Sequence, residues 1–302
     1  MTDAARLLSA NEPGDAERIR IDAFETLMRY CGPSVYYRGL VEFSNICSCD
    51  CYYCGIRSSN AGVRRYELDD NEIIAAARWC AQQGYGSVVM QSGERSDEAF
   101  VSRVESLVRR IKLETASEKL PAGLGITLCV GEQTLETYRR FFRAGAHRYL
   151  LRIETSSPAL FARIHPPQQR LETRIKCLQD LRTAGFQVGT GVMIGLPGQC
   201  VEDLAADIEF FRKIDVDMIG MGPYIMHRDT PMAGWQQDYR LPLSPLLMAL
   251  RMIAVTRIVL KDVNIAATTA LQALSPDGRE QGLQHGANVL MPQLTPLEHR
   301  KD

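Results

Sequence analysis

The 302-residue sequence has no excess of charge of either sign. Lysine and arginine number 35, aspartate and glutamate number 36, and the formal net charge is −1. A protein that binds nucleic acid or an acidic membrane through its charge needs a clear excess of basic residues. The composition therefore predicts neither nucleic acid nor a membrane as a partner.

Long apolar runs are also lacking. The richest, residues 246–260, is interrupted by Arg251 and Arg257. The first 15 residues include acidic side chains and contain no apolar core of signal-peptide length. The cysteines number nine, which is odd, and most stand alone in the sequence, so a secreted disulfide framework is disfavoured. We therefore expect a cytoplasmic protein without a targeting or membrane-spanning segment.

Short runs rich in β-branched residues alternate with longer amphipathic segments, a pattern typical of parallel βα units. Strands are predicted at residues 36–45, 87–91, 125–130, 148–154, 187–194, 218–222, 264–270 and 288–291. Helices are predicted at residues 16–30, 70–83, 97–115, 135–144, 174–184, 201–214 and 246–260. This order indicates an α/β fold, a closed (β/α)8 barrel of the TIM type, whose reactive residues lie at the C-terminal strand ends. We expect an N-terminal helical extension, residues 1–34, and one barrel domain, residues 35–302.

Three cysteines follow the first predicted strand in the pattern Cys47-x3-Cys51-x2-Cys54. Cubane iron–sulfur clusters are held by cysteine thiolates, usually one to each iron, so this loop can bind three irons and leave the fourth open. An open iron can chelate a small molecule and pass it an electron. A structural zinc site with Cys49 as fourth ligand is the alternative, although the usual second, well-separated ligand pair is missing. We interpret Cys49 as a loop residue that binds no metal.

The triplet, with the aromatic Tyr53 before its last cysteine, resembles the signature of the radical S-adenosylmethionine (SAM) superfamily. The resemblance implies a [4Fe–4S] cluster held by Cys47, Cys51 and Cys54, with SAM bound at the open iron. One electron from the cluster would then cleave SAM to a 5′-deoxyadenosyl radical. Such a radical must be shielded from solvent, and the mouth of a barrel supplies a closed cavity.

Other strand ends resemble the SAM-binding motifs of the superfamily. The SAM-binding residues that this resemblance implies are Tyr53, Gln91, Ser92, Gly93, Glu94, Glu154, Arg174, Met193 and Ile225. Glu94 would accept a hydrogen bond from the ammonium group of SAM, Glu154 would bind the ribose diol, and Arg174 would pair with the methionine carboxylate. Without the cysteines, an ordinary strand-to-helix turn is the preferred interpretation of Ser92 to Glu94. Glu154 would then be a commonplace strand-end carboxylate, and a solvated helix arginine would explain Arg174 equally well.

Three further stretches resemble the HydE family of radical SAM enzymes, the maturases of FeFe-hydrogenases: residues 148–155, residues 220–231, and residues 267–270 with 286–292. The resemblance implies a small organometallic substrate, an iron bound to carbon monoxide, cyanide and cysteine. It also implies an electron donor such as ferredoxin or flavodoxin, and other hydrogenase maturases as partners. The implied substrate-binding residues are Thr127, Arg148, Arg152, Thr268, Thr269 and Met291.

Two points from the residues themselves qualify this substrate site. Adjacent Thr268 and Thr269 cannot both point into the barrel under ideal strand alternation. A buried Arg152 is harder to explain as mere packing, because an unpaired guanidinium costs several kcal/mol to desolvate.

Two other hypotheses stay open. One is a relative of biotin synthase or methylornithine synthase that acts on an amino-acid-derived or other small substrate, although only Cys129 offers an inward thiol for a further cluster. The other is a non-enzymatic iron–sulfur or zinc module. His165 and His227 are assigned no catalytic role under any of them.

Overall fold

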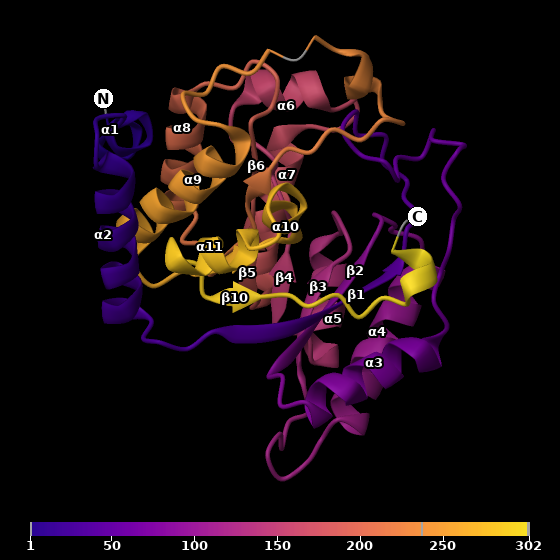
Figure 1. The fold of residues 1–302 in the computed structure, drawn as a ribbon. Helices are drawn as coiled ribbons and strands as arrows, with labels where there is room; N and C mark the ends of the chain where they lie inside the picture. The colour runs from indigo at the N-terminus through magenta and orange to yellow at the C-terminus, as the bar shows by residue number, and fades with distance from the viewer. Residues whose placement is uncertain (1, 237, 301–302) are drawn as a thin grey trace.

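A computed structural model of the protein describes residues 2–236 and 238–300 and contains a closed barrel of parallel strands (Figure 1). Around the barrel the strands are β1 (Tyr36–Ser44), β10 (Val289–Leu290), β9 (Asn264–Ala267), β7 (Met218–Ile219), β5 (Gln187–Thr190), β4 (Arg148–Leu150), β3 (Gly125–Cys129) and β2 (Ser87–Ser92). The predicted (β/α)8 barrel is confirmed. Residues 301 and 302 of the predicted barrel domain lie outside the described residues.

Helices surround the barrel and connect its strands. They are α1 (Asp3–Ser9), α2 (Asp15–Tyr30), α3 (Asp70–Gln82), α4 (Glu98–Glu114), α5 (Leu135–Ala144), α6 (Pro158–Ile164), α7 (Leu171–Ala184), α8 (Val201–Lys213), α9 (Pro245–Leu260), α10 (Thr269–Leu274) and α11 (Gly278–Gln284). The N-terminal pair packs on the barrel's helical layer, α1 against α8 and α9 and α2 against α9, at the left of Figure 1. Sequence analysis missed α1, α6, α10 and α11, which are too short to show a clear periodicity.

Local sequence signals set the ends of the longer helices. The side chain of Asp69 caps α3 while the side chain of Glu72 accepts a hydrogen bond from the Asp69 N–H, which completes a capping box. Asp97 caps α4 through the Phe100 N–H. Gly145 and Gly185 end α5 and α7 with φ of +117° and +102°, so both helices end where the sequence predicted, at residues 144 and 184.

Several predicted strands are shorter in the structure, most clearly those predicted at residues 148–154, 187–194, 218–222 and 264–270. β4 ends at Leu150, and the next two are interrupted, giving β5 with β6 (Met193–Ile194) and β7 with β8 (Gly222–Pro223). β6 and β8 pair with each other in a separate two-stranded sheet. A Cβ on Gly191 would lie 1.8 Å from the Gly220 carbonyl oxygen, so the two backbones touch where the ladder breaks.

Strand alternation separates the inner and outer faces of the barrel. Ile126 and Leu128 on β3 belong to the large buried apolar core. Because successive side chains of a strand point to opposite faces, the residue between them, Thr127, points to the inner side, where it is also fully buried. On β1 the inner positions include Leu40 and Glu42, which line a cavity inside the barrel. Side chains at these inner positions near the strand ends form the candidate site.

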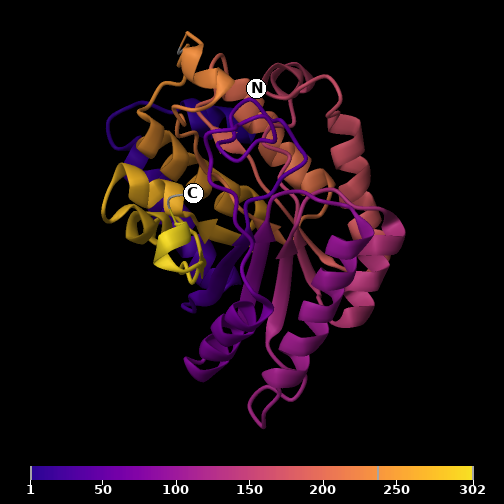
Figure 2. The same cartoon turned by 90° about the vertical axis from the view of Figure 1, so that its right-hand side faces the viewer.

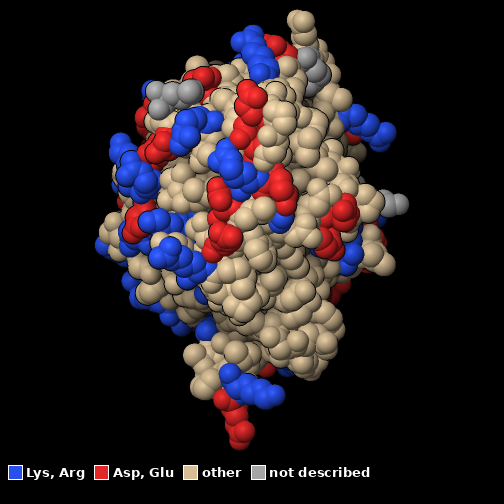
Figure 3. Space-filling model, turned by 60° about the vertical axis from the view of Figure 1, so that its left-hand side comes forward, with Lys and Arg blue, Asp and Glu red and all other residues tan. Residues whose placement is uncertain are grey.

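The surface carries charges of both signs. Figure 3 brings the side with α2 forward and shows Lys and Arg interspersed with Asp and Glu over its upper part, with a broad uncharged area lower down. Exposed apolar side chains on α2 include Phe24, Met28 and Tyr30. Among the helices of residues 2–236 and 238–300, none combines the length and the apolar character needed to cross a membrane.

Asp207 on α8 is a fully buried carboxylate that fixes the turn after β4. Its Oδ1 accepts hydrogen bonds from the backbone N–H and the hydroxyl of Ser156, both at 2.6 Å. Its Oδ2 has no partner among the described residues. Burial raises the pKa of Asp207 to about 7.

This carboxylate predicts a pH-dependent stability. Because the pKa of Asp207 rises from 3.8 to about 7 on folding, the folded protein binds the proton more tightly, and the free energy of unfolding falls between pH 4 and pH 7. Asp207→Asn keeps an acceptor for Ser156 but cannot ionise, and should remove up to about 4 kcal/mol of this fall. Urea unfolding at pH 4 and pH 8 measures it, with exposed Asp22→Asn as control. Equal pH dependence in Asp207→Asn and the native chain would contradict the prediction.

Candidate active site

The loop after β1, residues 45–66, carries the cysteine triplet and lies above the ends of the neighbouring strands (Figure 2). Asn45 donates to the Arg64 carbonyl at 2.8 Å, and Arg65 Nη1 donates to the carbonyls of Asn45 and Ile56, both at 2.7 Å. The Ser48 N–H donates to the Glu94 carbonyl at 2.9 Å. These bonds hold the loop in shape and tie it to the C-terminal end of β2.

Two backbone N–H groups are directed at the sulfur of Cys47, the first of the predicted cluster ligands. Cys47 Sγ accepts from the backbone N–H groups of Cys49, at 3.4 Å, and of Glu94, at 3.3 Å. Cys51 is 9% exposed, and its thiol donates to Gln169 Oε1 at 3.3 Å. N–H donors such as the two at Cys47 surround the thiolates of iron–sulfur clusters and tune their potential. Three thiols in one short loop, with these donors at the first of them, are a donor set that fits a [4Fe–4S] cluster.

The four thiols of the loop differ in their electrostatic setting. Hydrogen bonding with the Cys49 thiol lowers the pKa of Cys47 and of Cys51, whereas burial raises the pKa of Cys54 to about 12. Iron binding supplies the charge that keeps a buried thiol such as Cys54 deprotonated. Cys49 Sγ donates to Glu94 Oε1 at 3.1 Å. That Cys49 binds no metal stays a prediction.

Tyr53 is held by a histidine. Its hydroxyl lies 3.2 Å from His165 Nε2, and His165 Nδ1 lies 3.0 Å from the Phe161 carbonyl oxygen. Since a carbonyl only accepts, Nδ1 carries the proton and Nε2 accepts from Tyr53. The two rings meet edge to face with centroids 5.3 Å apart. This contact gives His165 a structural role in positioning Tyr53.

The motif from Gln91 to Glu94 ends β2 directly beside the cysteine loop. A Cβ on Gly93 would lie 2.4 Å from the Ile46 carbonyl oxygen, so only glycine permits the close approach of the two segments. The Ser92 hydroxyl donates to the Gly93 carbonyl at 2.7 Å. Glu94 Oε2 accepts from the Glu132 N–H at 2.9 Å. Burial raises the pKa of Glu94, although the positive charge of Arg174 acts to lower it.

Arg174 joins the ends of three strands. It lies in the first turn of α7, which begins at Leu171, three residues earlier than predicted. Its Nε donates to Glu132, its Nη1 donates to the Arg152 carbonyl at 2.7 Å, and its Nη2 lies 3.8 Å from Glu94. Burial acts to lower the pKa of Arg174, but the charges of Glu132 and Glu94 outweigh it and raise the pKa. Sequence analysis missed Glu132, although it too is a carboxylate just beyond a strand end.

Arg152 and Glu154 form a bidentate ion pair just beyond β4. The Nε–Oε1 distance is 2.9 Å and the Nη2–Oε2 distance is 3.0 Å. Arg152 also donates to the carbonyls of Gly220, at 2.5 Å, and of Val192, at 3.0 Å. Glu154 has φ of +62°, a conformation that costs a non-glycine residue about 1–3 kcal/mol and is concentrated at functional sites.

A cavity of about 350 Å³ opens inside the barrel near these strand ends. The predicted residues that line it are Gln91, Arg152, Met193, Thr268, Thr269 and Met291. Thr127 is level with Leu40 of the lining in the strand register, and its Oγ1 has no partner in the described part of the chain. Ile225 follows β8 and is 44% exposed, outside this lining. The cavity thus gathers most of the predicted substrate residues.

Both threonines line the cavity, which corrects the expectation from strand alternation. β9 ends at Ala267, one residue earlier than the first threonine, so the period of two no longer applies. Thr268 is the cap residue of α10 and Thr269 its first residue. The Thr268 hydroxyl donates to the Met221 carbonyl at 3.3 Å.

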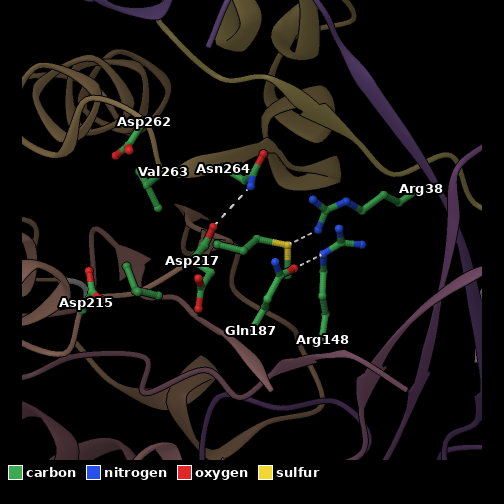
Figure 4. A pocket seen from close by; sticks show the side chains of 10 residues that line it. Arg38, Arg148, Gln187, Asp215, Asp217, Asp262, Val263 and Asn264 are labelled. Carbon is green, nitrogen blue, oxygen red and sulfur yellow. Dashed lines mark hydrogen bonds between the residues drawn. The ribbon is translucent and has the colours of Figure 1, made fainter. Parts of the chain in front are cut away.

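Arg148 does not line this cavity, which contradicts its prediction as a substrate residue beside Arg152. It is the first residue of β4, and four strand residues span about 13 Å. Its Nε donates to Gln187 Oε1 at 2.7 Å, beside Arg38, whose Nη1 lies 2.6 Å from Met218 Sδ (Figure 4). These side chains line a separate polar cavity of about 210 Å³ at the N-terminal ends of the strands.

Comparison with known proteins adds the following similarities. The model of the radical SAM superfamily matches residues 41–211. The chain is 40% identical to the [FeFe] hydrogenase maturase subunit HydE of Thermotoga maritima over 295 residues, 97% of this chain and 80% of that protein. It is 24% identical to biotin synthase of Mycobacterium avium over 276 residues, 89% of this chain and 74% of that one. The crystal structure of methylornithine synthase (PylB) shares the fold, with a TM-score of 0.83, 22% identity, and coverage of 99% of this chain and 83% of that one.

Proposed function

Because this chain belongs to the radical SAM superfamily and, within it, to the HydE family, we propose that it processes an iron precursor in FeFe-hydrogenase maturation. It is a radical SAM enzyme that uses a [4Fe–4S] cluster and SAM. The family also implies a small substrate and an electron donor. The observation that carries the proposal is 40% identity to a HydE protein across 97% of the chain.

In this proposal Cys47, Cys51 and Cys54 hold the cluster. When bound, the cluster supplies the electron that cleaves SAM to a 5′-deoxyadenosyl radical. Glu94 accepts hydrogen bonds from the SAM ammonium group, and Glu154 accepts them from the ribose hydroxyls. Each carboxylate oxygen has two lone pairs, so both residues can bind SAM while they keep their present contacts.

The remaining SAM contacts come from neighbouring segments. Arg174 neutralises the methionine carboxylate, and its contacts with Glu132 and Glu94 fix the guanidinium in place. Tyr53 and Gln91 to Gly93 shape the pocket, together with Met193 and Ile225. A water-excluding pocket of this kind protects a radical from quenching.

The substrate that we propose is a small iron complex carrying carbon monoxide, cyanide and cysteine. Its place is the cavity lined by Arg152, Thr268, Thr269 and Met291, with Thr127 level with Leu40 of that lining. After its four present hydrogen bonds, the Arg152 guanidinium keeps one N–H for an anionic ligand. The partners that we propose are ferredoxin or flavodoxin as electron donor, and the other hydrogenase maturases.

Anaerobic reconstitution with iron and sulfide tests this function. We expect a [4Fe–4S] cluster by EPR and Mössbauer spectroscopy, and release of methionine and 5′-deoxyadenosine from SAM after reduction. Added to a maturation mixture that lacks only its HydE protein, the reconstituted protein should activate apo-hydrogenase. Uptake of zinc alone, or SAM left intact by the reduced protein, would overturn the proposal.

A further inference from the structure

Glu42 is a buried carboxylate in the cavity wall that the proposed function leaves without a task. It lies on the inner face of β1, paired in register with Gln91 of β2. Among the described residues that line the cavity, it is the one with a carboxylate. The sequence contains its signal, an acidic residue two positions after the inward Leu40 and between the apolar Val41 and Phe43.

Two amides fix the orientation of the Glu42 carboxylate. Gln91 Nε2 donates to Oε1 at 3.3 Å, and Gln293 Nε2 donates to Oε2. No lysine or arginine of the described residues forms an ion pair with it within 4 Å. Arg300 is the cation whose charge acts on it, but that guanidinium donates to the carbonyls of Thr295 and Gln293.

This environment leaves the carboxylate incompletely compensated. Burial raises the pKa of Glu42, opposed by the Gln293 hydrogen bond and the charge of Arg300. An ionised carboxylate has about four acceptor sites, and the two amides fill two of them. A buried charge with neither a counter-ion nor a full set of hydrogen bonds is unfavourable, so the site gains most from a ligand that brings an N–H donor, preferably a cationic one.

We propose that Glu42 recognises an amine of the substrate, either a free ammonium group or an amine bound to a metal. Arg152, beyond β4 on another wall of the cavity, keeps one N–H for an anionic group. The cavity therefore suits a ligand with an amine at one end and an anionic group at the other, as in an amino-acid-derived ligand. The inference rests on the proposed function, since it takes this cavity as the substrate site.

A pair of probes that differ only in the amine tests the inference. S-methyl-L-cysteine and 3-(methylthio)propanoate have the same thioether and carboxylate, and neither has a free thiol that would bind iron. Isothermal titration of the SAM-loaded holoenzyme should show S-methyl-L-cysteine binding about tenfold more tightly, as expected for a hydrogen bond to a charged group. Glu42→Gln keeps the size of the side chain and should reduce this preference below about threefold.

Controls separate the inference from the proposed function. Glu98→Gln, at an exposed position of α4, should keep the tenfold preference. Cluster content and SAM cleavage are measured on the same preparations, so failure of the proposed function is seen as loss of cleavage by the native chain. If cleavage is intact, then equal binding of the two probes, binding of neither, or a preference that survives Glu42→Gln overturns the role of Glu42.

Discussion

Replacement of Cys51 by alanine is expected to remove both the [4Fe–4S] cluster and all SAM cleavage. Cys51 is the most buried of the predicted cluster ligands and lies beside Gln169. A loop that supplies three thiolates cannot lose one without leaving a second iron unligated. Anaerobic reconstitution followed by iron and sulfide analysis measures the first loss, and chromatography of 5′-deoxyadenosine measures the second.

Cys49→Ala is the matched control for this prediction. Cys49 lies in the same loop, and its thiol donates to Glu94 instead of completing the signature spacing. We expect this variant to assemble the cluster and to cleave SAM. Loss of the cluster in Cys49→Ala would favour a four-cysteine site, and retention of the cluster in Cys51→Ala would show that the triplet is not its ligand set.

The cysteine loop and the order of strands could be predicted because each is specified by residues close together in the sequence. Period-two and helical patterns alternate along the chain, and closure of the barrel follows from eight such units in series. The cysteine signature is confined to Cys47 to Cys54, and the fold places it at a strand end without any long-range information. The same holds for Glu94 and Glu154, which lie two and four residues beyond the ends of β2 and β4.

The rest of the site depends on contacts between distant segments. The break between β5 and β6 lies where Gly191 contacts Gly220, a contact between segments that a local sequence pattern does not predict. Thr268 and Thr269 both reach the cavity because β9 ends early. Glu42 is oriented by Gln293, 251 positions along the chain.

Arg148 shows a different limit. It lies four residues before Arg152, so strand alternation places both side chains on the inner face of the barrel. Alternation does not say at which end of the barrel a side chain lies. The place of Arg148 as the first residue of β4, beside Gln187 at the start of β5, puts it among the N-terminal strand ends.

Replacement of Arg152 by methionine is expected to have the second large effect, on stability and on activity together. The change removes the bidentate partner of Glu154, whose side chain is only 9% exposed. Breaking a buried pair by removing one partner costs about 3–5 kcal/mol, because the other charge remains buried and uncompensated. The variant also loses donors to the carbonyls of Gly220 and Val192, which hold the barrel mouth. Urea unfolding of the apoprotein measures the loss of stability.

The double variant Arg152→Met with Glu154→Gln separates the two effects. Neutralising Glu154 removes the orphaned charge, so the double variant should recover a large part of the lost stability, and the coupling in the double-mutant cycle should exceed about 1 kcal/mol. Substrate processing should remain lost, because neither the guanidinium nor the carboxylate is restored. Arg109→Met, at an exposed ion pair of α4, controls for removing an arginine. Additive effects of the two substitutions would mean that the pair is not a unit, and normal hydrogenase maturation by the double variant would remove both residues from the active site.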